Sequence, residues 1–289
     1  MLNILDQIGQ WIKDFLIECI IGNLSGLFDM VNKEVGDAAL SVGKTPQDWN
    51  SGVFSIIQSL SDNVIVPIAG IVITFVLCYE LISMIIEKNN MHDFDTFNLF
   101  KWIFKVFVAT YLVTHTFDIT MAIFDLSQHV VQESAGVITG DTAINFETAL
   151  GSLTSQLETM GMGELFGLLV ETMLIKATTP IMSLCVMLVL VGRMVEIYIY
   201  CSVGAIPFAT MTNREWGQMG NNYLRGLVAL GLQGFFIMVC LAIYSALVST
   251  IGSAEDIHVA IWSCAGYTLL LCFSLFKTGS ISKSVFNAH

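Results

Sequence analysis

Four ionisable residues lie within or beside long apolar stretches of the sequence: Glu80, Asp118, Arg193 and Glu196. A charged side chain inside a bilayer is costly, so such residues usually line a water-filled path or pair with one another. Arg193 and Glu196 are three residues apart, which places them on one face of a helix and lets them pair. We expect the four residues either to line a lumen or join helices, or simply to snorkel or pair near the membrane surface.

Residue patterns that carry catalysis or metal binding are weak. Ser280 to Lys283 matches S-x-x-K and Lys277 to Gly279 matches K-T-G, but serine hydrolases place these motifs far apart and in the opposite order. The five histidines lack the spacing of metal ligands, and the seven cysteines include no C-x-x-C pair. We therefore expect no enzyme activity, no metal and no cofactor, although bound lipid is compatible with the sequence.

The composition indicates that much of the chain lies in a bilayer. Of the 289 residues, 55% are hydrophobic and only 12% are charged, whereas a soluble domain carries about 25% charged residues. The formal net charge of -12 argues against a surface that grips nucleic acid or anionic lipid, because both attract clustered Lys and Arg. We predict an all-α, multi-pass helix bundle in the cell membrane.

Five apolar segments have the length of a membrane span, at about 64–86, 99–124, 178–206, 224–248 and 259–276. The third belongs to a longer apolar block over 165–206 that contains Pro180. Because one span needs only about 20 residues, either this block crosses twice or residues 165–177 form a separate helix at the membrane interface.

The charges of the loops decide between these alternatives. The region 125–164 contains no Lys or Arg, and neither does the loop 249–258. Lys and Arg flank the loops 87–98 and 207–223 and follow the last span. By the positive-inside rule, the two regions without Lys or Arg are external, and the two loops and the tail that carry Lys or Arg are cytoplasmic. We therefore predict five crossings with an interfacial helix at 165–177, the N-terminus outside and the C-terminus in the cytoplasm.

An amphipathic segment precedes the spans. We assign residues 1–62 to amphipathic helices at the outer face and residues 63–289 to the transmembrane domain. Apolar residues recur at helical spacing over 2–22, opposite an acidic polar face. Such a helix lies on a membrane surface or packs on a partner. The residues expected at the membrane surface are Ile8, Trp11, Ile12 and Phe15.

The most distinctive segment is the polar loop between the third and fourth spans. It concentrates side chains that form hydrogen bonds and carry charge: Asn213, Arg214, Glu215, Trp216 and Arg225. Arg and Trp at a membrane surface contact lipid headgroups. A hairpin with so many polar groups can instead dock a partner protein at the cytoplasmic face. Both interpretations remain open.

The same segment resembles a known family of membrane proteins. The residues that carry the resemblance are Ala205-Ile-Pro-Phe-Ala-Thr, Asn213-Arg-Glu-Trp-Gly, Asn222-Tyr-Leu-Arg-Gly and Gln233-Gly-Phe-Phe-Ile-Met-Val. They resemble TrbL-type (VirB-six-like) polytopic subunits of conjugative type IV secretion systems, in the variety encoded on integrative and conjugative elements of Gram-positive bacteria. The resemblance covers the last three spans and the tail after them, and the first two spans are similar by topology.

The resemblance implies a channel or scaffold subunit of a machine that moves DNA or protein across the membrane. It implies a ring of identical subunits, of which a pentamer is one option. The implied partners are other secretion-system subunits, ATPases, the coupling protein, lipid and, transiently, DNA. Glu80, Asp118 and an Arg193–Glu196 pair would line or brace the lumen. This arrangement raises a difficulty, because an acidic lumen repels the phosphates of DNA.

Two other functions remain open from the sequence. One is a structural scaffold of the same machine without a lumen. The other is a small-solute secondary transporter, which usually has internal repeats and paired broken helices at mid-membrane. The sequence contains one proline-broken block, around Pro180, without a second copy. The number of subunits and the presence of a central opening would discriminate between these functions.

Overall fold

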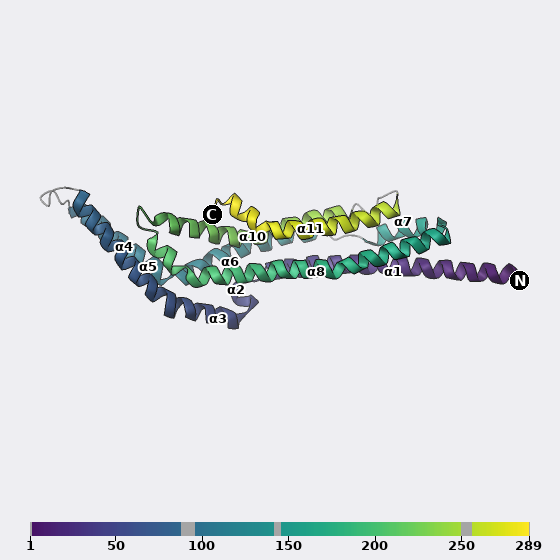
Figure 1. Ribbon diagram of the computed structural model, residues 1–289, viewed down its shortest axis with the longest axis horizontal. Coiled ribbons are helices and arrows are strands. Elements are labelled where there is room, and N and C mark those ends of the chain that lie inside the picture. Colours follow the sequence, from purple (N-terminus) through teal and green to yellow (C-terminus); the bar gives the residue numbers. More distant parts are fainter. Residues whose placement is uncertain (1, 88–95, 142–145, 250–255, 289) are drawn as a thin grey trace. The chain divides into compact units, whose positions relative to one another are not determined.

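The computed structural model describes residues 2–87, 96–141, 146–249 and 256–288, which are helical apart from short turns (Figure 1). No strand occurs within these ranges, so the predicted all-α class is confirmed. The helices, with η1 a π-helical turn, are α1 (Leu2–Val42), α2 (Pro46–Trp49), α3 (Ser51–Leu60), η1 (Ser61–Ile65), α4 (Val66–Glu87), α5 (Thr96–Thr114), α6 (Thr116–Asp141), α7 (Phe146–Thr159), α8 (Met162–Val203), α9 (Ala205–Thr210), α10 (Gly217–Ser249) and α11 (Ile257–Val285).

The chain forms two compact units, each assembled from distant parts of the sequence. Unit 1 contains Met1–Val42, Gln132–Leu190 and Phe235–Thr278. Unit 2 contains Gly43–Val131, Val191–Gly234 and Gly279–His289. Helices α6, α8, α10 and α11 each contribute residues to both units. The assignment of residues 1–62 to the outer face stays a prediction.

Five helical segments are long and apolar enough to cross a membrane, namely Ser51–Ile86, Phe97–Thr114, Met162–Val203, Gly217–Val248 and Ile257–Val285. The predicted count of five is confirmed. The sidedness of the two termini stays a prediction.

The first of these segments is longer than predicted because α3, η1 and α4 follow one another without a break. Pro67, at the start of α4, has no N–H to donate, and its ring clashes with the carbonyl four residues earlier in a regular helix. The helix widens by one residue just before it, and the N–H of Val66 bonds to the carbonyl of Ser61. A π-turn of this kind re-aims a helix without ending it.

The second segment is shorter than predicted, because α5 ends at Thr114 and α6 begins at Thr116. The hydroxyl of Thr114 donates to the carbonyl of Thr110 at 2.9 Å, and that of Thr116 donates to Leu112 at 2.8 Å. Side-chain bonds to the preceding turn bend a helix. Asp118 consequently lies in the first turn of α6, outside the five candidate segments.

The third segment, α8, is one helix of 42 residues that continues through Pro180. The structure therefore has no separate helix over 165–177. Pro180 cannot donate to the carbonyl of Lys176, but the hydroxyl of Thr179 donates to that carbonyl at 2.6 Å. Threonine hydroxyls commonly replace the bond that a proline removes from a membrane helix. The interfacial position of residues 165–177 stays a prediction.

In unit 1, the long helix α1 packs along α7 and α8 (Figure 1). Lys13 donates to the carbonyl of Glu158 on α7 at 2.7 Å. Further along α1, Ser183 of α8 donates to the carboxylate of Glu34 at 2.6 Å. These polar bonds tie the predicted amphipathic helix to the rest of unit 1.

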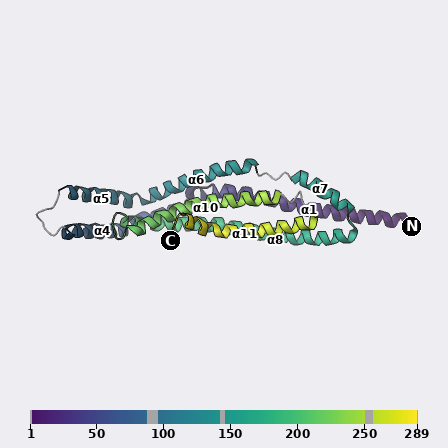
Figure 2. The ribbon, with the colours of Figure 1, turned by 90° about the horizontal axis from the view of Figure 1, so that it is seen from above.

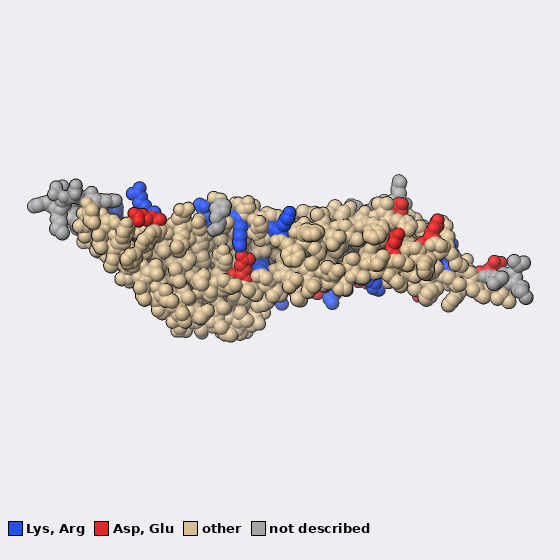
Figure 3. Space-filling view, viewed as in Figure 1, with Lys and Arg blue, Asp and Glu red and all other residues tan. Residues whose placement is uncertain are grey.

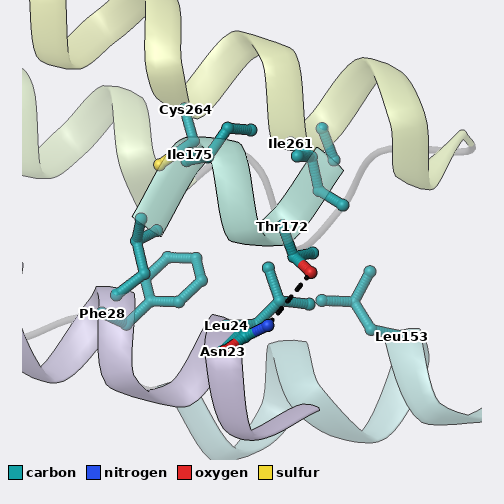
Figure 4. A pocket seen from close by; sticks show the side chains of 10 residues that line it. Asn23, Leu24, Phe28, Leu153, Thr172, Ile175, Ile261 and Cys264 are labelled. Atoms are coloured by element: carbon teal, nitrogen blue, oxygen red, sulfur yellow. Dashed lines mark hydrogen bonds between the residues drawn. The ribbon is translucent and has the colours of Figure 1, made fainter. Parts of the chain in front are cut away.

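Figure 4 shows a small apolar cavity that α1, α7, α8 and α11 surround in unit 1. Its volume is about 20 Å³, which is room for about one water molecule. The amide of Asn23 donates to the hydroxyl of Thr172 at 3.4 Å beside it, and Leu24, Phe28 and Ile261 supply apolar walls. The cavity is a packing gap between helices and is too small for a ligand.

Candidate functional site

Glu80 on α4 pairs with Lys105 on α5, and the carboxylate accepts a hydrogen bond from the ammonium group. The two helices lie side by side in unit 2, and Figure 2 shows them as the two arms of one hairpin. Trp102 of α5 also donates to the carbonyl of Leu77 on α4, at 3.3 Å. Glu80 therefore joins two candidate spans, and a lysine neutralises its charge.

Arg193 on α8 lies buried against α10, with 4% of its surface exposed. Its guanidinium donates to the backbone carbonyls of Leu230 at 3.5 Å and Gly231 at 3.2 Å. No carboxylate forms an ion pair with it within the described ranges. Backbone carbonyls are a recognised partner for an arginine inside a membrane protein. Arg193 therefore holds α8 to α10.

Glu196, one turn further along α8, pairs with Lys283 of α11 at 2.5 Å. The neighbouring Ser282 donates to the carbonyl of Ala229 on α10, also at 2.5 Å. The predicted pairing of Arg193 with Glu196 is therefore wrong. Both residues lie on α8, but Arg193 bonds to α10 and Glu196 pairs with α11. The spacing of residues along α8 carries no information about these partners.

Glycines on α10 let the surrounding helices of unit 2 approach closely. A Cβ atom at Gly231 would lie 2.8 Å from the Cβ of Ser127 on α6, and one at Gly226 would lie 3.0 Å from the ring of Tyr200 on α8. Real Cβ atoms essentially never approach another heavy atom as closely as at Gly231, and the distance at Gly226 is tighter than nine in ten real Cβ contacts. Close approach through small residues is typical of packing between membrane helices.

Asp118, the fourth polar candidate, is exposed on α6. It lines a shallow cleft of about 190 Å³ in unit 2, together with Gln58 and Asp125. Asp118 therefore takes no part in the inter-helix contacts that Glu80, Arg193 and Glu196 make.

The turn before α10 is organised by Asn213, which is 6% exposed. Its side-chain oxygen accepts hydrogen bonds from the N–H groups of Glu215 at 2.8 Å and Trp216 at 3.1 Å. An asparagine side chain that satisfies backbone donors fixes the chain entering a helix. Asn213 thus stabilises the turn internally, whereas the sequence analysis placed it among the residues that contact lipid headgroups or a partner protein.

The same turn is fastened to α4 by aromatic stacking. The indole of Trp216 stacks on Phe75 and on Tyr79, with ring centroids 5.6 Å apart in both pairs. The hydroxyl of Tyr79 donates to the carboxylate of Glu215 at 3.4 Å. Arg214 and Arg225 instead remain exposed and line one cleft. Of the five loop residues, the two arginines are thus the ones free to meet another molecule.

The predicted membrane-surface residues of α1 form an exposed apolar stripe. The exposed fractions are 49% for Ile8, 68% for Trp11, 37% for Ile12 and 52% for Phe15. The rings of Trp11 and Phe15 stack, with centroids 6.0 Å apart. The contact of this stripe with a membrane stays a prediction.

Sequence reasoning missed the two lysines that complete the ion pairs. The sequence argument used Lys105 only as a loop charge, and Lys283 only as a tail charge and as part of a rejected S-x-x-K match, but each neutralises an acid on another helix. A lysine close to an apolar segment, with an acid in another segment, was the available signal. In the part of the chain that the structure describes, no group of three His, Cys, Asp or Glu could hold a metal ion.

The chain matches the family model described as TrbL/VirB6 plasmid conjugal transfer like protein, over residues 31–205. This range is more than half of the 289 residues. The chain belongs to the TrbL/VirB6 family. No curated protein and no solved structure matches it.

Family membership rests on a different part of the chain from the one that carried the resemblance. The matched range includes Glu80, Arg193 and Glu196 and ends at Ala205, where the motif-bearing segment begins. As a TrbL/VirB6 protein with five apolar helices, the chain is a multi-pass membrane subunit of a conjugative transfer system. The Gram-positive variety of the family stays a prediction.

Proposed function

We propose that this subunit assembles with copies of itself into a ring, which forms a membrane channel for DNA or protein in the conjugation apparatus. The observation that carries the proposal is the bare apolar surface of the first three candidate spans. Within the protomer, 22% of the most apolar part of both Ser51–Ile86 and Met162–Val203 and 11% of that of Phe97–Thr114 is buried, against 56% for Gly217–Val248. Surface of this extent contacts lipid or further subunits.

A stripe of aromatic residues on α5 supports contact with another subunit. The stripe consists of Phe100, Phe104, Phe107 and Tyr111, which are 65%, 67%, 69% and 53% exposed. Spacings of four, three and four residues place them on one face of the helix. Lipid requires only an apolar surface, whereas aromatic rings supply a large part of the energy of protein interfaces. We therefore assign the α5 aromatic stripe to the interface between subunits.

The pairing of the acids supports a lumen through which DNA can pass. Lys105 pairs with Glu80 and Lys283 pairs with Glu196 within the protomer, so neither acid presents an unbalanced charge to a lumen. Most of the face shown in Figure 3 is uncharged, and basic and acidic side chains meet at two places on it. An uncharged lining avoids the repulsion of phosphate that an acidic lumen would exert.

We further propose that the ring works with other secretion-system subunits, the ATPases and the coupling protein, and contacts DNA only transiently. In this proposal the chain carries no enzymatic step. It needs no cofactor apart from lipid, and a pentamer is one option for the ring.

A scaffold without a lumen is the second candidate, and one observation favours it. Glu80, Arg193 and Glu196 all join helices inside the protomer, as expected of residues that brace a structure. The transporter alternative is weaker. Secondary transporters use broken helices at mid-membrane, whereas α8 continues through Pro180.

The size of the assembly tests the proposed interface. We would measure the mass of the full-length protein in lipid nanodiscs for the wild type and for Phe104→Ala/Phe107→Ala. The matched control is Phe273→Ala/Phe276→Ala, which removes two exposed rings from α11. We expect the α5 variant to fall apart into smaller species, while the wild type and the control remain oligomeric. A monomeric wild type, or equal assembly of all three proteins, would contradict the proposal.

A further inference from the structure

A polar cleft of about 430 Å³ lies beside the start of α10 in unit 2. The guanidinium groups of Arg214 and Arg225 line it, together with the side-chain amides of Gln218, Asn221 and Asn222. Among the residues that the structure describes, no carboxylate lines it. Arg214 also borders a neighbouring cleft that Glu80 and Glu215 line. The chain as a whole has 24 acidic residues and only 12 basic ones, so the two arginines give the polar cleft a charge opposite in sign to that of the protein. Such a site favours an anion.

Neither arginine of the cleft is used to hold the fold. Both side chains are exposed, and within the described ranges neither takes part in an ion pair. The adjacent acid, Glu215, is directed to the hydroxyl of Tyr79. Arg193, by contrast, already donates its hydrogen bonds to backbone carbonyls of α10. The two guanidinium groups are therefore available to a ligand.

The wall of the cleft is built by close packing of the turn on α9. A Cβ atom at Gly217 would lie 2.9 Å from the carbonyl oxygen of Met211, and one at Gly220 would lie 2.7 Å from that of Pro207. Asn213 fixes the intervening backbone through its two hydrogen bonds. A wall that is already ordered lowers the entropic cost of binding.

The position of the cleft indicates the source of the anion. Its lining residues run from Met211, in the turn that follows the candidate span Met162–Val203, to Arg225, in the first turns of the candidate span Gly217–Val248. A cleft at the end of a span is close to a membrane surface. Trp216 and Tyr79 stack beside it, and such aromatic residues are enriched at the level of the headgroups. Two cations are too few for a nucleic-acid track, which contacts several successive phosphates.

We propose that this cleft binds the headgroup of an anionic glycerophospholipid, such as phosphatidylglycerol. Arg214 and Arg225 hold the phosphate, because the planar guanidinium matches phosphate oxygens in a bidentate way. The amides of Asn221 and Asn222 meet the hydroxyl groups of the glycerol. The cleft has room for such a headgroup, which is larger than a phosphate ion alone. The proposal needs only the membrane location of the chain and does not depend on channel formation.

Lipid binding to the purified full-length protein tests the assignment. The protein would be stripped of lipid in detergent and titrated with phosphatidylglycerol or phosphatidylcholine, with bound lipid counted by native mass spectrometry. Separate samples would contain phosphatidylglycerol with an equal concentration of inorganic phosphate or of a short oligothymidylate. We expect phosphatidylglycerol to be preferred over phosphatidylcholine, and neither competitor to displace it.

Substitutions locate the preference in the cleft. In Arg214→Gln/Arg225→Gln we expect the preference for phosphatidylglycerol to fall roughly tenfold or more. Lys33→Gln/Lys44→Gln removes the same charge from two exposed lysines outside the cleft, and we expect it to leave the preference unchanged. Asn221→Asp keeps both arginines but adds a repelling carboxylate, so it also lowers the preference and serves if the arginine variant does not fold.

Four results would overturn the proposal. Equal binding of the two lipids by the wild type would show that the cleft does not select an anion. Displacement by inorganic phosphate or by the oligonucleotide would assign the cleft to free phosphate or to nucleic acid. An unchanged preference in folded Arg214→Gln/Arg225→Gln and Asn221→Asp, or an equal loss in the lysine control, would remove the cleft as the binding site.

Discussion

The guanidinium of Arg193 donates a hydrogen bond to the backbone carbonyl of Gly231, 3.2 Å away on a neighbouring helix. The carbonyls of Ala229 and Leu230, just before it on α10, accept bonds from Ser282 and Arg193. Three successive carbonyls of α10 thus receive donors from α8 and α11. The glycine at 231 leaves room for Ser127, so the same turn of α10 is where α6, α8 and α11 meet it.

The first prediction concerns the buried arginine. Replacing Arg193 with Gln shortens the side chain and removes the charge-assisted bonds to α10. We expect the free energy of unfolding to fall by about 1–2 kcal/mol, the upper part of the range for polar bonds between membrane helices. Unfolding by sodium dodecyl sulfate in mixed micelles measures this change. Lys44→Gln, at an exposed position, should unfold like the wild type, and an equal effect of both substitutions would argue against the assigned bonds.

The second prediction concerns close packing at Gly231. An added methyl group would meet the Cβ of Ser127 at 2.8 Å, so Gly231→Ala should destabilise the protein by about 1–3 kcal/mol, as overpacking does. Adding Ser127→Gly removes the obstructing Cβ and should restore much of the loss. Gly266→Ala on α11, where nothing lies within 4 Å of the new atom, is the matched control. Failure of Ser127→Gly to rescue the variant would show that another contact is responsible.

The third prediction concerns the pair between α4 and α5. Glu80→Lys and Lys105→Glu each place like charges together, so each should weaken assembly and conjugative transfer. The double exchange restores an ion pair and should recover much of the transfer. Because the lysine is 44% exposed, solvent screening keeps the effect on protomer stability below about 1 kcal/mol. If both single variants transferred DNA normally after normal assembly, the pair would have no role in function.

The fourth prediction uses two thiols of unit 1. Cys185 on α8 and Cys272 on α11 lie close enough in unit 1 for their thiols to interact. Mild oxidation of the protein in membranes should therefore form a disulfide within one chain, visible as a faster band on a non-reducing gel. Cys185→Ser should abolish the faster band, whereas Cys78→Ser, which changes an exposed thiol on α4, should not. A band that persists in Cys185→Ser would place α8 and α11 differently.

The fold was largely predictable from the sequence because membrane spans are coded by local apolar runs. The continuity of α8 through Pro180 was not predictable in this way. There the hydroxyl of Thr179 replaces the hydrogen bond that Pro180 removes. The division between α5 and α6 was not predictable either, because it involves the hydroxyl groups of Thr114 and Thr116, which bond to the preceding turn. Such side-chain details change the bounds of a helix without changing its apolar pattern.

The candidate site was less predictable, because its partners are distant in sequence. Glu196 and Lys283 are 87 residues apart, and Glu80 and Lys105 are 25 apart. Spacing along one helix favoured Arg193 with Glu196, and no local rule indicated that the carbonyls of α10 were the better partner for the arginine. The polar loop was recognised, but the division of its residues into Asn213 inside and two arginines outside required the packing of the turn.

Imaging of the purified full-length protein in lipid nanodiscs tests the central claim, a ring-forming channel, most directly. We predict a closed ring of identical subunits with a continuous central opening, and with the Glu80–Lys105 pair away from that opening. A ring whose centre is filled by side chains would instead favour the scaffold. A monomer with a closed pocket at mid-membrane would contradict the account outright.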